Sequence, residues 1–119
     1  MIDINKKASN GEVPREGVLD TIGSTPLIHL CRYLGTADIQ LYAKMEAFNP
    51  GGSAKDRPAR AMIEEALRAG TIDRNTTIIE STSGNMGIGL AQACCYYGLP
   101  LICVVDPFAQ EQNVAIMQA

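Results

Sequence analysis

The stretch from residue 76 to residue 105 limits this chain to a small set of folds. It begins with a β-branched segment (76–80), continues as an apolar helical segment (86–97) and ends in a second extended segment (101–105). The last segment is apolar at every position, which is typical of a strand inside a parallel sheet. Two parallel strands joined by a helix form a right-handed crossover. The sequence therefore predicts the α/β class, with an open parallel sheet and flanking helices.

The rest of the chain extends this pattern without internal repeats. A short strand is expected at 27–30, and polar and apolar residues alternate along 39–46 as in a half-exposed strand. A helix follows, whose apolar residues recur at helical spacing and form one buried face: Ala59, Met62, Ile63, Ala66 and Leu67. Another helix is expected at 111–118, so the predicted order is β, β, α, β, α, β, α.

Composition and charge exclude several classes of protein. The 119 residues carry a net charge of −3 and no basic stripe, so no nucleic-acid partner is expected. The longest apolar run, 99–105, is far too short to span a membrane. Residues 1–10 are polar and contain no signal-peptide core. We therefore expect a cytoplasmic protein with no membrane partner.

Metal chemistry is not expected either. The four cysteines form no Cys-x-x-Cys pair and His29 is the only histidine, so the spacing of zinc ligands is absent from the sequence. The single histidine also weakens a Ser-His-Asp interpretation, because no Gly-x-Ser-x-Gly motif accompanies it. We expect His29 to be structural.

The segment 49–57 places a lysine where a helix normally disfavours a cation. Local physics predicts a turn followed by a helix start, with Ser53 as the capping residue and Asp56 as its partner three residues later. This explanation leaves Lys55 unexplained, because the first turn of a helix is the positive end of its dipole. Lysine amines in such surroundings form Schiff bases with carbonyl compounds such as pyridoxal phosphate.

A run of small polar residues follows the first strand of the crossover. Ser81, Thr82, Ser83, Gly84 and Asn85 lie between that strand and the next helix, where open α/β sheets bind ligands. Free backbone N–H groups at the helix start, together with the hydroxyls and the amide, could bind an anion. The alternative is a simple helix cap, for which one hydroxyl is sufficient.

The glycines of this region do not form a nucleotide-binding loop. Neither the phosphate-loop pattern nor Gly-x-Gly-x-x-Gly is present, because the spacing here is Gly84-x-x-Gly87-x-Gly89. A small anion such as an amino-acid carboxylate suits the loop better than a nucleotide does. Gly87 and Gly89 are expected to let the helix pack closely on a neighbour.

The chain resembles the cysteine synthase family in three ordered segments. They are 21–27 (Thr-Ile-Gly-Ser-Thr-Pro-Leu), 49–57 (Asn-Pro-Gly-Gly-Ser-Ala-Lys-Asp-Arg) and 80–85 (Glu-Ser-Thr-Ser-Gly-Asn). This family of fold type II pyridoxal-phosphate enzymes also contains cystathionine β-synthase and the serine/threonine dehydratases. The resemblance covers residues 21 to about 106.

The resemblance implies roles for the residues singled out above. Lys55 would form the Schiff base with pyridoxal 5′-phosphate and later remove the α-proton of the substrate as a general base. Asn85 would hydrogen-bond the 3′-oxygen of the cofactor, and the loop from Ser81 to Asn85 would bind the carboxylate of an amino-acid substrate. The implied reaction is a β-replacement on O-phosphoserine or O-acetylserine through an aminoacrylate, in a homodimeric enzyme.

Some positions point to one branch of the family. Cysteine synthases usually have proline where Ser81 stands and threonine where Met86 stands. Ser81, Pro58 and the segment 103–107 are more similar to the siderophore-pathway branch, the N-(2-amino-2-carboxyethyl)-L-glutamate synthases. Those enzymes join O-phosphoserine to glutamate on the way to 2,3-diaminopropionate. Glutamate is therefore the predicted nucleophile, with sulfide as the alternative.

The resemblance also implies a division of the chain. Residues 1–26 would be an N-terminal arm, 27–48 would supply two strands to a larger domain, and 49–119 would form part of a smaller domain. Family members are more than twice as long, so a truncated, incomplete enzyme is expected, with apolar sheet faces exposed and no turnover by these residues alone. Two alternatives remain, namely a non-catalytic module that binds an anion and a fragment that folds only with another chain.

Overall fold

The computed structural model describes residues 14–30, 32 and 39–119. The helices are α1 (Asp56–Arg68), α2 (Asn85–Tyr97) and α3 (Glu111–Gln118), and the strands are β1 (Leu27–His29), β2 (Tyr42–Lys44), β3 (Ile78–Ser81) and β4 (Leu101–Val104). Two short 3-10 helices, η1 (Val18–Thr21) and η2 (Glu46–Phe48), precede β1 and follow β2. The order of strands and helices is the predicted one. Residues 1–13 of the predicted arm lie outside the described residues.

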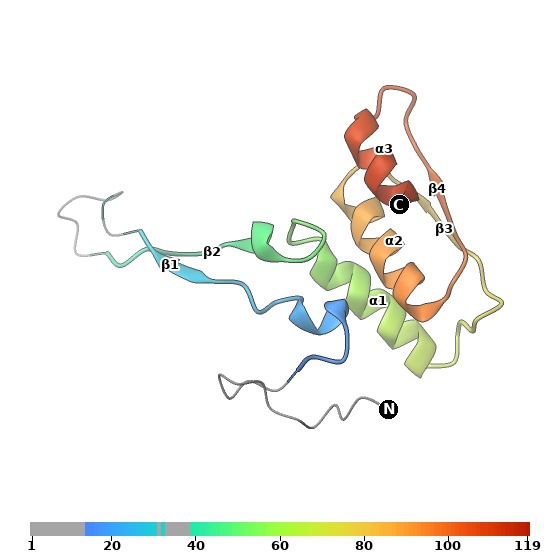
Figure 1. Cartoon of the computed structure of the whole chain (residues 1–119), viewed down its shortest axis with the longest axis horizontal. Coiled ribbons are helices and arrows are strands. Elements are labelled where there is room, and N and C mark those ends of the chain that lie inside the picture. The colour runs from blue at the N-terminus through green and yellow to red at the C-terminus, as the bar shows by residue number, and fades with distance from the viewer. Residues whose placement is uncertain (1–13, 31, 33–38) are drawn as a thin grey trace.

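The predicted crossover is present. β3 and β4 are parallel and pair in the register Ile79 to Ile102 and Ser81 to Val104. They are joined through α2, which lies along one face of this sheet with α1 and α3 beside it (Figure 1). The structure thus confirms the α/β class.

The two earlier strands form a separate sheet. β1 and β2 pair antiparallel, with Leu27 opposite Lys44, and the rings of His29 and Tyr42 stack 4.8 Å apart. This ribbon extends away from the helices (Figure 1). β2 is shorter than the strand predicted at 39–46, and at its C-terminal end this is because Met45 leaves the extended conformation just before η2 begins. The β1–β2 pair is thus separate from the predicted parallel sheet, which β3 and β4 form.

The core lies between α1 and α2. Ala59 and Ile63 of α1 are buried against Leu90 and Ala93 of α2. These are two of the five apolar positions predicted to form the buried face of α1. Met62, another of the five, is about half exposed.

Both sheets carry exposed apolar side chains, as expected. Ile79, Ile102 and Val104 of the parallel sheet are all more than half exposed. α2 and α3 cover only one face of this sheet, which leaves the apolar residues of its other face exposed (Figure 1). No helix in the described part of the chain is both long enough and apolar enough to span a membrane.

Candidate active site

Lys55 immediately precedes α1, at the position predicted from the sequence. The helix begins at Asp56, and Lys55 already has helical dihedral angles (φ −72°, ψ −18°). Its side chain is exposed, and its amine makes no hydrogen bond with any residue that the structure describes. The backbone N–H of Lys55 donates to the hydroxyl of Ser53 at 3.1 Å. The lysine therefore stands at the start of the helix with an exposed amine that the described residues leave unengaged.

The predicted pairing of Ser53 with Asp56 is wrong. Asp56 is the first residue of α1, and its carboxylate accepts a hydrogen bond from the backbone N–H of Gly51 instead. A side chain at Gly51 would collide with this carboxylate. Asp56 is fully buried, and its second oxygen, Oδ1, has no hydrogen-bond partner among the described residues. Burial raises the pKa of Asp56 above its usual value. The carboxyl thus fixes the turn ahead of Lys55 rather than capping the helix.

A buried asparagine organises the same turn. Asn49 is 3% exposed and donates through Nδ2 to the carbonyl of Ser53 at 2.9 Å and to Oε2 of Glu46 at 2.8 Å. Its side-chain oxygen accepts a hydrogen bond from the backbone N–H of Gly23 at 2.8 Å. Asn49 therefore connects the lysine turn (residues 49–55) with the segment 21–27.

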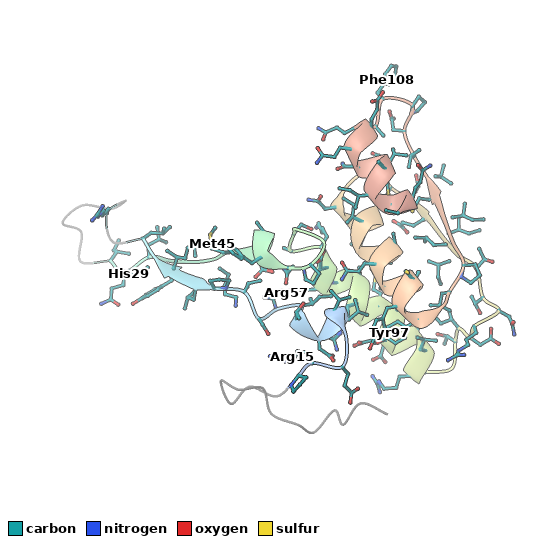
Figure 2. The ribbon with its side chains drawn as sticks, in the orientation of Figure 1. Arg15, His29, Met45, Arg57, Tyr97 and Phe108 are labelled. Carbon is teal, nitrogen blue, oxygen red and sulfur yellow. The ribbon has the colours of Figure 1, made fainter. Side chains whose placement is uncertain are left out.

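A charged pair makes a second connection. Arg57 donates to both carboxylate oxygens of Glu46, at 2.7 and 2.8 Å, and to the carbonyl of Gly23 at 3.2 Å. Thr25 donates to Glu46 at 2.7 Å. The hydrogen bonds from Arg57 and Thr25 hold the pKa of Glu46 well below its usual range. Figure 2 shows Arg57 between α1 and the segment that leads into β1.

These contacts explain why the first two sequence segments occur together. The local sequence of the segment 21–27 predicts only a turn. In the structure its Gly23 and Thr25 make tertiary contacts with the lysine turn and with the Arg57–Glu46 pair beside it. Glu46 was missed by the sequence analysis. Its only signal is its place on the polar side of the alternating segment 39–46.

The second loop is shorter at both ends than its prediction. Ser81 is the last residue of β3 and Asn85 is the first residue of α2, so the loop consists of Thr82, Ser83 and Gly84. Gly84 precedes α2, and no side chain in the described part of the chain caps this helix. The alternative of a simple hydroxyl cap is therefore wrong.

The start of α2 consequently has free donors. The first helical hydrogen bond runs from Ile88 N–H to the carbonyl of Gly84, at 3.3 Å. The N–H groups of the three residues before Ile88 have no intrahelical partner, as in any uncapped helix. Asn85 is the first residue of α2 and is exposed beside them. This arrangement can bind a small anion.

Gly89 brings the two segments together. A Cβ atom on Gly89 would lie 2.9 Å from Cβ of Ala59 and 3.1 Å from the backbone oxygen of Lys55. The backbone at Lys55 is therefore packed against α2, about one helical turn beyond Asn85. α1 and α2 run side by side with their starts at the same end (Figure 1). The close packing expected of the glycines is thus confirmed at Gly89.

A comparison with protein families identifies the group to which the chain belongs. The family described as "Pyridoxal-phosphate dependent enzyme" matches residues 18–119. The chain belongs to this family.

Individual relatives fall within the cysteine synthase group. An N-(2-amino-2-carboxyethyl)-L-glutamate synthase from Cupriavidus metallidurans is 45% identical over 101 residues, which is 85% of this chain and 30% of the relative. A hydrogen sulfide-producing enzyme from Fusobacterium nucleatum is 42% identical with a TM-score of 0.81, over 88% of this chain and 34% of the other. An O-acetylserine dependent cystathionine β-synthase from Helicobacter pylori is 37% identical, also with a TM-score of 0.81, over 90% and 36%.

The chain thus spans about a third of the length of the relatives it matches. These similarities establish fold type II for the described residues. Members of this family depend on pyridoxal phosphate, so the site should be able to hold this cofactor.

The described residues fit the reacting end of this cofactor. Lys55 offers an exposed primary amine that no described residue engages, and such an amine is what a Schiff base with the cofactor aldehyde requires. Asn85 and the uncapped start of α2 supply hydrogen-bond donors at the same end of the helix pair. The unengaged amine of Lys55 and the hydrogen-bond donors at the start of α2 together match the chemistry that pyridoxal phosphate requires.

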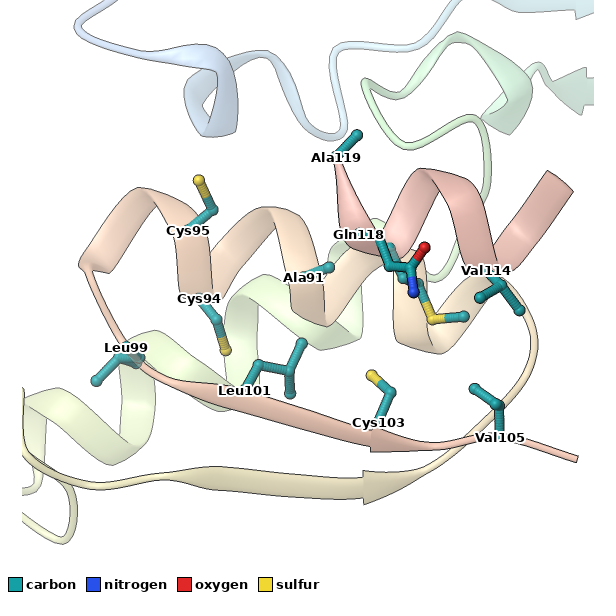
Figure 3. A pocket seen from close by; sticks show the side chains of 11 residues that line it. Ala91, Cys94, Cys95, Leu99, Leu101, Cys103, Val105, Val114, Gln118 and Ala119 are labelled. Carbon is teal, nitrogen blue, oxygen red and sulfur yellow. The ribbon is translucent and has the colours of Figure 1, made fainter. Parts of the chain in front are cut away.

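A cavity in the described structure lies elsewhere. It has a volume of about 450 Å³ and is lined from α2, β4 and α3, with Cys94, Leu101 and Cys103 among the lining residues. Figure 3 shows these side chains between the helices and the strand. None of the predicted site residues lines it, so this cavity is not the candidate active site.

Proposed function

We propose that this chain contributes the Schiff-base lysine and the substrate loop to a pyridoxal-phosphate enzyme that replaces the β-substituent of a serine derivative. The observation that carries the proposal is the packing of the Lys55 backbone on α2, whose uncapped start follows the loop Thr82–Gly84. Lys55 and Asn85 are the proposed cofactor-binding residues. Ser81, Thr82, Ser83, Gly84 and Asn85 are the proposed substrate-binding residues.

Each group has a defined task in this proposal. Pyridoxal phosphate, when bound, supplies an aldehyde to hold the amine and a ring that stabilises negative charge at the substrate α-carbon. Lys55 holds the cofactor and then accepts the α-proton on its Nζ atom. The free N–H groups at the start of α2 bind and orient the substrate carboxylate.

Glutamate is the proposed nucleophile. Phosphate or acetate leaves first, with the electron pair of the broken C–O bond, as Lys55 takes the α-proton. The amine nitrogen of glutamate then forms a bond to the β-carbon and gives up its own proton, and the α-carbon recovers a proton from Lys55. The 45% identity to an N-(2-amino-2-carboxyethyl)-L-glutamate synthase supports this choice, and with it a role in siderophore or diaminopropionate biosynthesis. Sulfide is the second candidate, because an O-acetyl serine sulfhydrylase from Entamoeba histolytica is also a structural relative, 34% identical with a TM-score of 0.83 over 99% of this chain and 36% of the other.

The assembly of the protein is part of the proposal. We assign residues 27–48 to a larger domain and 49–119 to a smaller one, because the β1–β2 ribbon stands apart from the sheet that α2 covers (Figure 1). The enzyme would act as a cytoplasmic homodimer. The residues described are expected to be inactive without the rest of the larger domain.

A labelling experiment tests the site. The protein is mixed with pyridoxal phosphate, its near-visible spectrum is recorded, and borohydride reduction is followed by peptide mapping. We expect a yellow band and selective labelling of Lys55. Lys44 serves as an internal control, because its amine donates to the carbonyl of Thr25 at 2.7 Å and is not free. Labelling scattered over the lysines would contradict the proposed role of Lys55.

A product analysis tests the reaction. The holoenzyme is incubated with O-phospho-L-serine or O-acetyl-L-serine and either L-glutamate or sulfide, and the products are identified by mass spectrometry. Glutamate should yield N-(2-amino-2-carboxyethyl)-L-glutamate, whereas cysteine as the main product would favour the sulfide reaction. A Lys55→Ala variant that binds amino acids as well as the wild type would favour a non-catalytic, anion-binding module.

A further inference from the structure

A side chain from α3 contacts the proposed substrate loop. Nδ2 of Asn113 donates a hydrogen bond to the backbone carbonyl of Ser83 at 3.1 Å, across a separation of 30 residues. Asn113 is half-buried, and nothing in its local sequence marks it as part of a site. This is the one hydrogen bond, among the described residues, that joins α3 to the loop.

The helix that carries Asn113 is held against the first turn of α2. Gly87 is buried there, and a Cβ atom on it would collide with the sulfur of Met117 and lie 2.9 Å from the methyl carbon of Thr82. Met117 and Asn113 are four residues apart on α3 and therefore share one face of that helix. The same helix face thus contacts both the start of α2 and the loop ahead of it.

The hydrogen bond fixes the direction of one peptide group. In a trans peptide the C=O of one residue and the N–H of the next point in opposite directions. When Asn113 holds the carbonyl of Ser83 toward α3, the N–H of Gly84 must point away from α3. Among the described residues, the N–H of Gly84 has one acceptor, the hydroxyl of Thr82 at a long 3.4 Å, and a glycine peptide rotates easily.

We propose that Asn113 is a positioning residue for the loop that binds the substrate carboxylate. By holding the Ser83 carbonyl, it keeps the peptide before α2 in the orientation in which the free N–H groups face the anion. This inference rests on the proposed function, because it assigns Asn113 to the same carboxylate site. Asn113 does not contact the substrate itself.

The test uses a matched pair of substitutions in the holoenzyme. Asn113→Asp keeps the size of the side chain but replaces its donor by an oxygen that repels the Ser83 carbonyl. Gln112→Glu makes the same chemical change at the neighbouring, exposed position. Asn113→Ala removes the donor without adding charge, and it decides the question if Asn113→Asp does not fold.

The readout is binding of L-serine and of L-serinamide, which lacks the carboxylate, measured from the spectral change of the bound cofactor. Loss of one hydrogen bond predicts an increase in the dissociation constant for L-serine of about fivefold to tenfold in both Asn113 variants. Binding of L-serinamide and the cofactor band at Lys55 should match those of Gln112→Glu. KM for the amino-acid substrate should rise more than kcat falls.

The outcomes separate this inference from the proposed function. If the Asn113 variants bind L-serine as tightly as Gln112→Glu does, the positioning role is wrong and the proposed function stands. If they weaken L-serine and L-serinamide equally, Asn113 has only a structural role and the inference is again wrong. If the wild type responds to no amino acid, the proposed function fails and the inference fails with it.

Discussion

The side chain of Asn49 accepts a hydrogen bond from the backbone N–H of Gly23, at 2.8 Å and across 26 residues of sequence. The same side chain donates to the carbonyl of Ser53, two residues before Lys55. The position of the lysine turn therefore depends on a segment that contributes no proposed catalytic group.

Replacing Asn49 by Asp should destabilise the protein strongly. The substitution preserves the acceptor for Gly23 but removes the Nδ2 donor and places a carboxylate beside that of Glu46. Burial leaves little room for water to compensate, so we expect a loss of about 3 kcal/mol in the free energy of unfolding. Urea unfolding monitored by circular dichroism measures it. Asn75→Asp is the matched control at an exposed position, and an equal loss in both variants would contradict the structural role of Asn49.

The stability of the protein should depend on the charge of Glu46. Its folded-state pKa is depressed below the usual value of 4.5 by Arg57 and Thr25. A depressed pKa contributes stability that is present above the unfolded-state pKa and is lost as the pH falls below it. We expect Glu46→Gln to be less stable than the wild type at neutral pH and to lose less stability on acidification.

The measurement for Glu46 is a series of unfolding curves from neutral pH down to about pH 3. Asp56 acts in the opposite direction, because burial raises its pKa and its contribution is lost as the pH rises. The comparison must therefore be between variants and not read from the wild-type curve alone. Parallel curves for Glu46→Gln and the wild type would disprove the prediction.

Gly89→Ala should separate α1 from α2. The added methyl group would lie 2.9 Å from Cβ of Ala59 and 3.1 Å from the carbonyl oxygen of Lys55, and backbone cannot move aside as a flexible side chain can. We expect a loss of about 1–3 kcal/mol in the free energy of unfolding. Gly84→Ala is the matched control for stability, because the space around Gly84 is open and its φ is −127°.

Labelling adds a second measurement for Gly89→Ala. The displaced lysine turn should reduce the selectivity with which pyridoxal phosphate labels Lys55. If Gly89→Ala is as stable as Gly84→Ala and still labels selectively, the close contact does not position the lysine.

Tyr97 should make the protein less stable in strong base. Its hydroxyl donates to Glu64 at 2.7 Å, and burial together with this carboxylate raises the pKa of Tyr97 from 10 to about 12. A raised pKa contributes stability that is present below the unfolded-state value and is lost as the pH rises through the folded-state value. The wild type should therefore lose stability between pH 10 and about 12, and the Tyr97→Phe variant should not show this loss.

Unfolding curves across this alkaline range test the prediction for Tyr97. Tyr96→Phe is the control, because Tyr96 is exposed and its hydroxyl makes no hydrogen bond with the described residues. The prediction fails if Tyr96→Phe and Tyr97→Phe have the same alkaline profile. Figure 2 shows Tyr97 near the end of α1, from which Glu64 comes.

The elements that could be predicted from sequence are those whose signals are local. The order of strands and helices follows from periodicity, and the position of Lys55 follows from its place before an amphipathic helix. The pairing of Ser53 with Asp56 was predicted wrongly because the nearby N–H of Gly51 competes for the carboxylate.

Tertiary partners were not predictable in the same way. Glu46 meets Arg57 across 11 residues, and Asn113 meets Ser83 across 30. Neither residue type is unusual where it stands, because Glu in an alternating segment and Asn in a helix are ordinary surface residues. Their roles depend on which elements the fold brings together, and a single sequence carries no record of that.

The contacts around the lysine turn also bear on the order in which the molecule folds. The hydrogen bonds from Gly23 to Asn49 and from Arg57 to Gly23 join residues 26 and 34 positions apart, so long loops must close before either can form. α1 consists of 13 consecutive residues and needs no such closure. We therefore expect α1 to form early in a nascent chain, well before the turn that holds Lys55 becomes ordered. The amine of Lys55 should be among the last groups to reach its final position.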